Sequence, residues 1–371
     1  MSERLVSLDV FRGMTIAGMI VVNNPGTWNA IYSPLAHAEW HGITPTDYIF
    51  PFFLFIVGTA IPFSLSKRLE SGKITADVFT KIIRRTIIIF ALGLLLALVP
   101  KFDLANLRIP GVLQRIAVCY FIASILFLYL DWKKLALLSA ILLLVYWILM
   151  TLVPVPGCIA PDIGSKVCNL AALLDRVILT EDHIWKQGKV FDPEGILSTI
   201  PAIASTISGV LTGMWLNRKI SKPEKAGGLL SAGVALCALG WIWNYVFPFN
   251  KALWTSSYSV YTTGLALCFL GFCFWVIDVK EYKKWAYPFR VFGMNALALF
   301  VFSGFLSKFL ILIKVDGADG KSISLQSAVF KSVFLPLASP INASLLYALF
   351  YLALWYVLMW VLYKRKIFIT I

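Results

Sequence analysis

The sequence predicts an all-α integral membrane protein, a bundle of about ten transmembrane helices formed by a single domain over residues 1–371. Hydrophobic residues make up 59% of the chain, charged residues only 14%, and the mean hydropathy is +0.81. A water-soluble domain carries charge on roughly a quarter of its residues. The apolar residues also come in blocks of about 18 to 25, long enough to cross a hydrocarbon core of about 30 Å.

Each predicted span is an apolar block that ends at Pro, Gly, Asn or a cluster of charges, as at 100–103 and 131–134. No small-residue cleavage site follows the first block, so we expect a retained span and not a cleaved signal peptide. The ten predicted spans cover residues 7–24, 47–66, 83–99, 110–130, 135–153, 196–216, 228–247, 258–277, 290–313 and 342–363.

The distribution of basic residues predicts which side of the membrane each loop faces. The chain has 33 Lys and Arg and a formal net charge of +14. If both termini are cytoplasmic, 21 of the 33 fall in cytoplasmic segments, ten in outer segments and two, Arg115 and Lys308, within spans. This bias follows the positive-inside rule, so we expect cytoplasmic termini and no nucleic-acid partner.

Three long segments, 25–46, 154–195 and 314–341, then lie on the outer face. The first has no Lys or Arg and is rich in aromatic residues. Trp40 in this segment fits an interfacial aromatic belt, although aromatic side chains also stack on sugar rings. No motif identifies the role of 314–341.

Two of the six cysteines lie close together in one outer loop. Cys158 and Cys168 are ten positions apart. On an oxidising face such a pair forms a disulfide, and the alternative is two free thiols. We favour the disulfide.

Polar side chains inside the predicted spans are costly in a bilayer and therefore mark functional candidates. Arg12 follows Asp9 by three residues, so the two share a helix face and can form an ion pair. Gln114 and Arg115 lie about one turn after Pro110, which suits a first helical turn. A hydrogen-bond network between helices and a contact with an anion both explain this Gln-Arg pair.

Two amides belong to the same set of candidates. Asn23 ends the first predicted span beside Pro25. It is explained either by a helix break or by an amide aimed into a cavity. Asn295 is a lone amide in the ninth predicted span.

His37 is one of three histidines and lies in the aromatic-rich outer segment. This segment leads into a predicted helix start, with Thr44 as the N-cap and Pro45 as the first helical residue. Asp47 falls at the third helical position, where a carboxylate favours the helix dipole. A capping role explains Asp47, and it does not prevent Asp47 from orienting the His37 imidazole.

Further polar residues on the outer face are candidates for binding a cationic amine or sugar hydroxyls. Asp192 and Glu194 precede the sixth span, where helix capping explains them equally well. Lys251 and Trp254 lie in the polar loop before the eighth span. The sequence contains no phosphate-loop, metal-cluster or Ser-His-Asp motif, so we expect no metal.

Six strings, in order over nearly the whole chain, resemble the heparan-α-glucosaminide N-acetyltransferase family, which includes a lysosomal enzyme and many bacterial relatives. Some of these relatives are labelled as N-acetylglucosamine-related transporters. The strings are RLVSLDVFRG, HAEWHGITPTDYIFPFFLFIVG, RIPGVLQRIAVCYF, FDPEGILSTIPAI, NKALWTSSYSVYTTGLAL and FGMNALALFVFSG.

The resemblance implies transfer of acetyl from cytosolic acetyl-CoA to a glucosamine-type amine on the far side of the membrane. It assigns catalytic roles to His37, Asn23 and Asp47. For a bacterial member we expect the inner membrane, a glucosamine-containing acceptor and a homodimer as one oligomeric state. Acceptor binding is assigned to Asp192, Glu194, Trp40, Lys251 and Trp254. Acetyl-CoA binding is assigned to Arg12, Gln114, Arg115 and Asn295.

Several alternatives stay open at this level. His37 acts either as a general base or as an acetyl carrier. An amino-sugar transporter is a second class of function, but the sequence shows no clear inverted repeat and few midplane acids. A third alternative is an acyltransferase that acts on a different cell-surface glycan.

Overall fold

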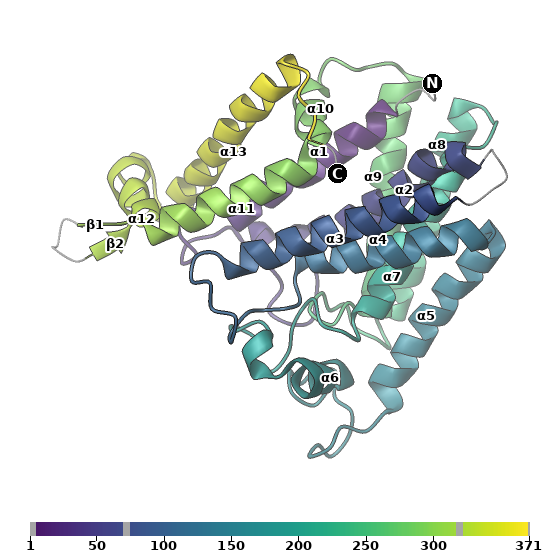
Figure 1. The fold of residues 1–371 in the computed structure, drawn as a ribbon, viewed down its shortest axis with the longest axis horizontal. Helices are drawn as coiled ribbons and strands as arrows, with labels where there is room; N and C mark the ends of the chain where they lie inside the picture. Colours follow the sequence, from purple (N-terminus) through teal and green to yellow (C-terminus); the bar gives the residue numbers. More distant parts are fainter. Residues whose placement is uncertain (1–4, 70–74, 317–321, 370–371) are drawn as a thin grey trace.

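The computed structural model describes residues 5–69, 75–316 and 322–369. Over these residues the regular secondary structure is helical apart from one short two-stranded antiparallel sheet, and irregular loops join the helices. The long helices pack into a bundle (Figure 1). They are α1 (Val6–Asn23), α2 (Ile49–Leu69), α3 (Ala76–Leu98), α4 (Val112–Tyr129), α5 (Trp132–Leu152), α7 (Thr199–Leu216), α8 (Lys222–Trp243), α9 (Ser256–Phe274), α11 (Ala296–Leu312) and α13 (Pro340–Lys364). The shorter elements are α6 (Leu170–Leu179), α10 (Tyr287–Met294), β1 (Lys314–Asp316), β2 (Ser322–Ser324) and α12 (Leu325–Val329).

Helices occupy all ten predicted spans, so the all-α polytopic membrane fold is confirmed. Within the described ranges, eight helical segments are long and apolar enough to cross a membrane. The pair α10 and α11 makes a ninth if it is one broken span. The remaining helix, α3, is 23 residues long but carries Lys81, Arg84 and Arg85 in its first half.

The predicted span 290–313 is not one continuous helix, which corrects the sequence-based expectation. The chain bends by 80° between α10 and α11. Asn295 stands at the bend with φ −126° and ψ 34°, outside the helical region. Its amide holds the C-terminal tail, since Nδ2 donates to Ile367 O (3.1 Å) and Oδ1 accepts from Ile369 N (2.8 Å).

Helices α2 and α7 pack closely against each other. A Cβ atom on Gly58 would lie 2.0 Å from the carbonyl oxygen of Thr206, and one on Gly209 would lie 2.1 Å from that of Phe55. Small residues at such a crossing let two backbones approach closely, which is how helices pack without a hydrophobic driving force in lipid. This contact fixes α2, and Asp47 lies in the 3₁₀ turn Pro45–Tyr48 immediately before this helix.

The loop between α1 and α2 is held by two other loops and by α12. Its Trp40 Nε1 donates to Ile163 O (2.9 Å) in the loop after α5. Gly42 N donates to Phe249 O (2.8 Å) in the loop before α9. In α12, the side chain of Gln326 donates to Pro25 O (3.2 Å), so part of the segment 314–341 holds this loop in place.

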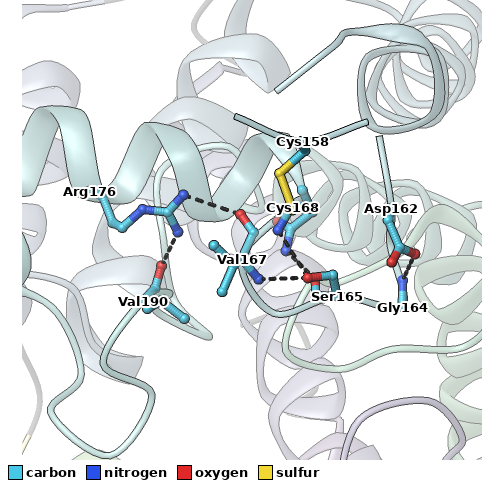
Figure 2. The surroundings of a disulfide bond; sticks show 9 residues. Cys158, Asp162, Gly164, Ser165, Val167, Cys168, Arg176 and Val190 are labelled. Atoms are coloured by element: carbon cyan, nitrogen blue, oxygen red, sulfur yellow. Dashed lines mark hydrogen bonds between the residues drawn. A yellow bond between two sulfur atoms is a disulfide. The ribbon is translucent and has the colours of Figure 1, made fainter. Parts of the chain in front are cut away.

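The predicted disulfide between Cys158 and Cys168 is confirmed (Figure 2). Their Cα atoms are 5.8 Å apart. Arg176 of α6 donates to Val167 O (3.1 Å) beside the disulfide and to Val190 O (2.8 Å) (Figure 2). These contacts join the disulfide loop, α6 and the chain that leads to α7.

Candidate active site

His37 and Asp47 form a close polar pair where the chain enters α2. Asp47 lies in the 3₁₀ turn Pro45–Tyr48, and its Oδ1 is 2.7 Å from His37 Nδ1. The Asp47 side chain is 1% exposed and that of His37 is 48% exposed. A carboxylate only accepts, so the hydrogen lies on Nδ1 and the lone pair on Nε2. The pair therefore leaves the lone pair of this half-exposed ring on Nε2, where it can act as a base.

The second carboxylate oxygen of Asp47 fulfils the capping role that the sequence predicts. Its Oδ2 accepts from Thr44 N (3.0 Å), Thr44 Oγ1 (3.1 Å) and Ala38 N (3.2 Å). The Tyr258 hydroxyl of α9 donates to the Asp47 backbone oxygen (2.6 Å). Asp47 is thus fixed from two sides, and it both caps the helix and orients His37.

Lys251 lies against the His37 ring. Its Nζ is 3.1 Å from both ring nitrogens and 3.8 Å from Asp47 Oδ1. Because Nδ1 carries the hydrogen and donates to Asp47, Nε2 alone offers the ammonium a lone pair. Burial lowers the pKa of Lys251, and the carboxylates of Asp47 and Glu194 oppose that shift.

A cavity of about 370 Å³ opens beside this pair. It brings four of the predicted site residues together: His37, Asn23, Glu194 and Lys251. Asn23 is exposed at the end of α1, whereas its neighbour Asn24 is buried and donates to Ile20 O (2.8 Å). Of the two amides, Asn23 is therefore the one that a ligand in this cavity can reach.

Arg108 was not predicted as a site residue. It forms ion pairs with both predicted acids, Asp192 and Glu194. Its guanidinium donates to both oxygens of Asp192 (2.6 and 2.8 Å) and to Glu194 Oε2. Burial lowers the pKa of Arg108, but the two carboxylates outweigh it and raise the pKa overall. Asp192 is fully buried behind Arg108, and Glu194 faces the cavity.

Two residues outside the cavity hold this network in place. Asp175 of α6 accepts from Asp192 N (3.1 Å) and Ile196 N (2.9 Å). Burial raises the pKa of Asp175 to about 6. His183 holds the other side, since its Nδ1 lies 2.8 Å from Leu107 O, next to Arg108.

Three predicted ligand-binding residues, Trp254, Arg115 and Gln114, lie in the packed interior and do not line the His37 cavity. Trp254 is 1% exposed, and its ring lies 5.2 Å from the Arg115 guanidinium. Arg115 Nη2 also donates to Gly195 O (3.0 Å), which fixes the turn before α7. Gln114 is buried, with its amide against Gly93 and Gly111.

Trp40 also lies outside the cavity lining. Its ring packs edge-on against Phe191, with centroids 5.1 Å apart. Its Nε1 donates a hydrogen bond to Ile163 O in the disulfide loop. In this position Trp40 links the His37 loop to the chain that carries Asp192.

A second cavity of about 260 Å³ lies deeper in the bundle. Arg12 of α1 and Arg85 of α3 line it, together with apolar side chains. Arg12 forms the predicted ion pair with Asp9 (3.4 Å). Phe53 and Phe300 line this cavity and also the His37 cavity, so the two adjoin at these rings.

The C-terminal tail closes part of this deeper cavity. Ile369 lines it, as do Gly293 and Met294 at the end of α10. Asn295 is absent from the lining, but its amide holds Ile369 in place. Asn295 therefore shapes the cavity from outside.

A family model described as the catalytic region of heparan-α-glucosaminide N-acetyltransferase matches residues 4–241. The chain belongs to the heparan-α-glucosaminide N-acetyltransferase family. The matched region runs from α1 into α8 and contains His37, Asp47 and Glu194. Lys251 and the helices from α9 onward lie outside it.

Two curated relatives carry the same family name. The mouse heparan-α-glucosaminide N-acetyltransferase is 28% identical over 81% of this chain, and the human protein is 30% identical over 80%. The chain spans about half the length of these relatives, 53% and 52% respectively. The family name supports an acyltransferase located in a membrane.

Arg108, Phe53 and Phe300 are cavity residues that the sequence-based assignment missed. Arg108 stands beside Pro110 in a string quoted for the family resemblance. Its ion-pair partners, Asp192 and Glu194, lie more than 80 positions away in the sequence, so no local sequence pattern marks Arg108 as a site residue. The two phenylalanines are indistinguishable by sequence from the many lipid-facing aromatics of this chain.

Proposed function

We propose that this chain transfers an acetyl group from acetyl-CoA to the amine of a glucosamine-type sugar. One observation carries the proposal: the His37–Asp47 pair borders a cavity that adjoins a second, arginine-lined cavity within the bundle. A base with an accessible Nε2 and two adjoining cavities are what a direct transfer between two substrates needs.

The deeper cavity is the proposed donor site. Arg12 and Arg85 would meet the phosphates of CoA, because guanidinium groups bind phosphate strongly. The apolar part of the lining suits the acetyl thioester end of the donor. To reach His37, this end must pass Phe53 and Phe300, and we expect their rings to rotate aside when the donor binds.

The His37 cavity is the proposed acceptor site. Glu194 faces it and would attract the ammonium form of the amino sugar. Lys251 would donate to a sugar hydroxyl once its ammonium is displaced from the His37 ring. The amine is then left close to Nε2.

The chemistry follows from these positions. The bound ammonium first releases one proton to solvent, because only the neutral amine has a lone pair. The amine nitrogen then attacks the thioester carbon while His37 Nε2 takes the second proton from the nitrogen. Asp47 stabilises the imidazolium that forms, and the Asn23 amide donates to the carbonyl oxygen as negative charge develops. The C–S bond then breaks, CoA leaves as a thiolate, and the thiolate accepts the proton from His37. In the rival route, Nε2 attacks the thioester carbon first, and the C–S bond breaks. CoA leaves as a thiol that carries the other ring proton, and the amine then displaces the imidazole from the acetyl group.

We also propose the sidedness and location. The excess of Lys and Arg in the loops remote from His37 supports cytoplasmic termini, with His37 on the outer side of a bacterial inner membrane. A homodimer is the oligomeric state that we would test first.

Purified protein incubated with labelled acetyl-CoA and glucosamine tests the activity. We expect N-acetylglucosamine and free CoA in equal amounts. Sugar uptake into protein-containing liposomes without acetyl-CoA, and without any acetylated product, would instead identify an amino-sugar carrier.

A further inference from the structure

The residues that follow α13 turn back onto the bundle. Lys366 has a left-handed backbone (φ 56°), Lys366 N donates to Tyr363 O (3.1 Å), and Ile367 N donates to Leu362 O (2.9 Å). These are the two hydrogen bonds of a Schellman turn, which ends a helix. The chain then runs back past α10 (Figure 1). We call residues 367–369 the strap.

Asn295 holds the strap through both groups of its side-chain amide. Nδ2 donates to Ile367 O (3.1 Å), and Oδ1 accepts from Ile369 N (2.8 Å). Asn295 is 1% exposed and stands at the 80° bend between α10 and α11. A buried amide needs a partner for its donor and for its acceptor, and the peptide groups of the strap supply both.

The strap also bounds the proposed donor site. Ile369 lines the deeper cavity, as do Arg12, the proposed phosphate contact, and Met294, the neighbour of Asn295. The cavity measures about 260 Å³. Drug-sized ligands fill pockets of roughly 300–1,000 Å³, and acetyl-CoA is larger than most such ligands. The cavity as the strap bounds it therefore holds only part of the donor.

The strap is a wall that can move at low cost. Ile367, Phe368 and Ile369 are 44%, 39% and 43% exposed. Every other residue of the cavity lining belongs to a helix. A segment with few buried contacts opens locally at a small fraction of the free energy of global unfolding.

The groups that the strap offers to Asn295 have a counterpart in CoA. The strap presents the carbonyl that precedes Phe368 and the N–H that follows it. The pantetheine arm of CoA has the same order: a carbonyl precedes its β-alanyl unit and an N–H follows it, with one methylene group more between them. Asn295 can therefore exchange the strap for this arm without losing either hydrogen bond.

From this match we infer that the strap is an autoinhibitory mimic of the pantetheine arm, which occupies Asn295 until the donor displaces it. The inference rests on the proposed function, since it takes the deeper cavity as the donor site. A protein that binds its ligand only in an open state shows an affinity reduced by the fraction of molecules that are open. Loosening the strap should therefore tighten donor binding.

Ile369→Pro loosens the strap, because proline has no N–H for Asn295 Oδ1 to accept. Ile369→Val is the matched control, since it keeps the N–H and a branched apolar side chain. We expect Ile369→Pro to lower the Kd for CoA and for pantetheine about fivefold, the factor that one hydrogen bond typically contributes. The Kd for adenosine 3′,5′-bisphosphate, which lacks the arm, should stay unchanged. Isothermal titration calorimetry measures all three.

Two further variants make the result specific. A variant that ends at Lys366 lacks the strap and should lower the Kd for CoA at least as much as Ile369→Pro does. In an Asn295→Ala background, Ile369→Pro should leave the Kd for CoA unchanged, because the contact that it removes is already gone.

Weaker CoA binding by Ile369→Pro or by the shortened chain would mean that the strap forms part of the donor site, and would overturn the inference. Equal CoA affinities of Ile369→Pro and Ile369→Val, or an equal gain for the bisphosphate, would also overturn it and leave the proposed function intact. If neither the native protein nor any variant binds CoA, the proposed function and this inference fail together.

Discussion

His37 and Asp47 are ten positions apart, and their 2.7 Å contact uses only one of the two Asp47 carboxylate oxygens. The other oxygen accepts from the backbone and side chain of Thr44. Helix capping and orientation of the imidazole are therefore separable by mutation, although one carboxylate performs both.

Replacement of His37 tests the proposed base. His37→Gln removes the basic imidazole nitrogen. We expect kcat/KM for glucosamine to fall by at least about a hundredfold, which is the lower end of general-base contributions. His41→Gln is the control, because His41 is absent from the cavity lining. Steady-state kinetics on both variants give the comparison, and equal rates for His37→Gln and the native protein would refute the base.

Asp47→Asn and Thr44→Ala separate the two roles of the carboxylate. Both weaken the cap and should lower the free energy of unfolding by about 1 kcal/mol. Only Asp47→Asn also disturbs the Nδ1–H tautomer of His37, so it alone should lower kcat, by about tenfold or more. Thermal unfolding and kcat are measured on both variants. A similar kcat loss in Thr44→Ala would mean that the loop, and not the carboxylate, controls the rate.

Arg85→Gln tests the donor site. We expect the KM for acetyl-CoA to rise about tenfold, which corresponds to the loss of one charge-assisted contact, with the KM for glucosamine unchanged. Arg84→Gln is the neighbouring control, because Arg84 is exposed and does not line the cavity. If both variants raise the KM for acetyl-CoA equally, general surface charge explains the effect.

The raised pKa of Asp175 predicts that the stability of the protein depends on pH. Its folded pKa of about 6 lies above the ordinary value of 3.8 because of burial, so the folded state binds the proton more tightly than the unfolded state. This contribution is complete below about pH 4 and is lost as the pH rises to about 6, by up to about 3 kcal/mol. Asp175→Asn removes the titration. The difference in unfolding temperature between native protein and variant should thus change between pH 4 and 6 and be constant above pH 7.

Gly58→Ala tests the contact between α2 and α7. The added Cβ would meet the Thr206 carbonyl oxygen at 2.0 Å, and such overpacking costs about 1–3 kcal/mol. Gly227→Ala is the control, since no heavy atom lies within 4 Å of its added Cβ. Replacing this helical glycine should leave stability unchanged or raise it by about 0.5–1 kcal/mol. Unfolding temperatures in the same detergent compare the two.

Much of the fold was predictable because a helix that crosses the bilayer needs an apolar block of a fixed minimum length, and such blocks can be seen in the sequence. The helix start at Thr44 and the disulfide pair Cys158–Cys168 were also predictable, since capping and loop closure are local. The break at Asn295 was not, because it depends on the C-terminal tail more than 70 residues later.

The candidate site was predictable only where residue type and local setting agreed. His37, Asn23 and Glu194 do line one cavity. Trp254 has the same aromatic, loop-located character as a sugar-stacking residue, yet tertiary packing buries it. Residue type and sequence position alone cannot distinguish a residue that lines the cavity from one that is buried in the packed interior.

Phe53 and Phe300 also bear on how the membrane keeps its electrochemical gradient. An uninterrupted column of water from one face to the other would conduct protons and dissipate the membrane potential. Hydrophobic constrictions exclude water and ions. Under the proposed sidedness the two cavities would open to opposite faces. The two phenyl rings that line both cavities would then separate the two water-filled spaces and prevent a proton leak.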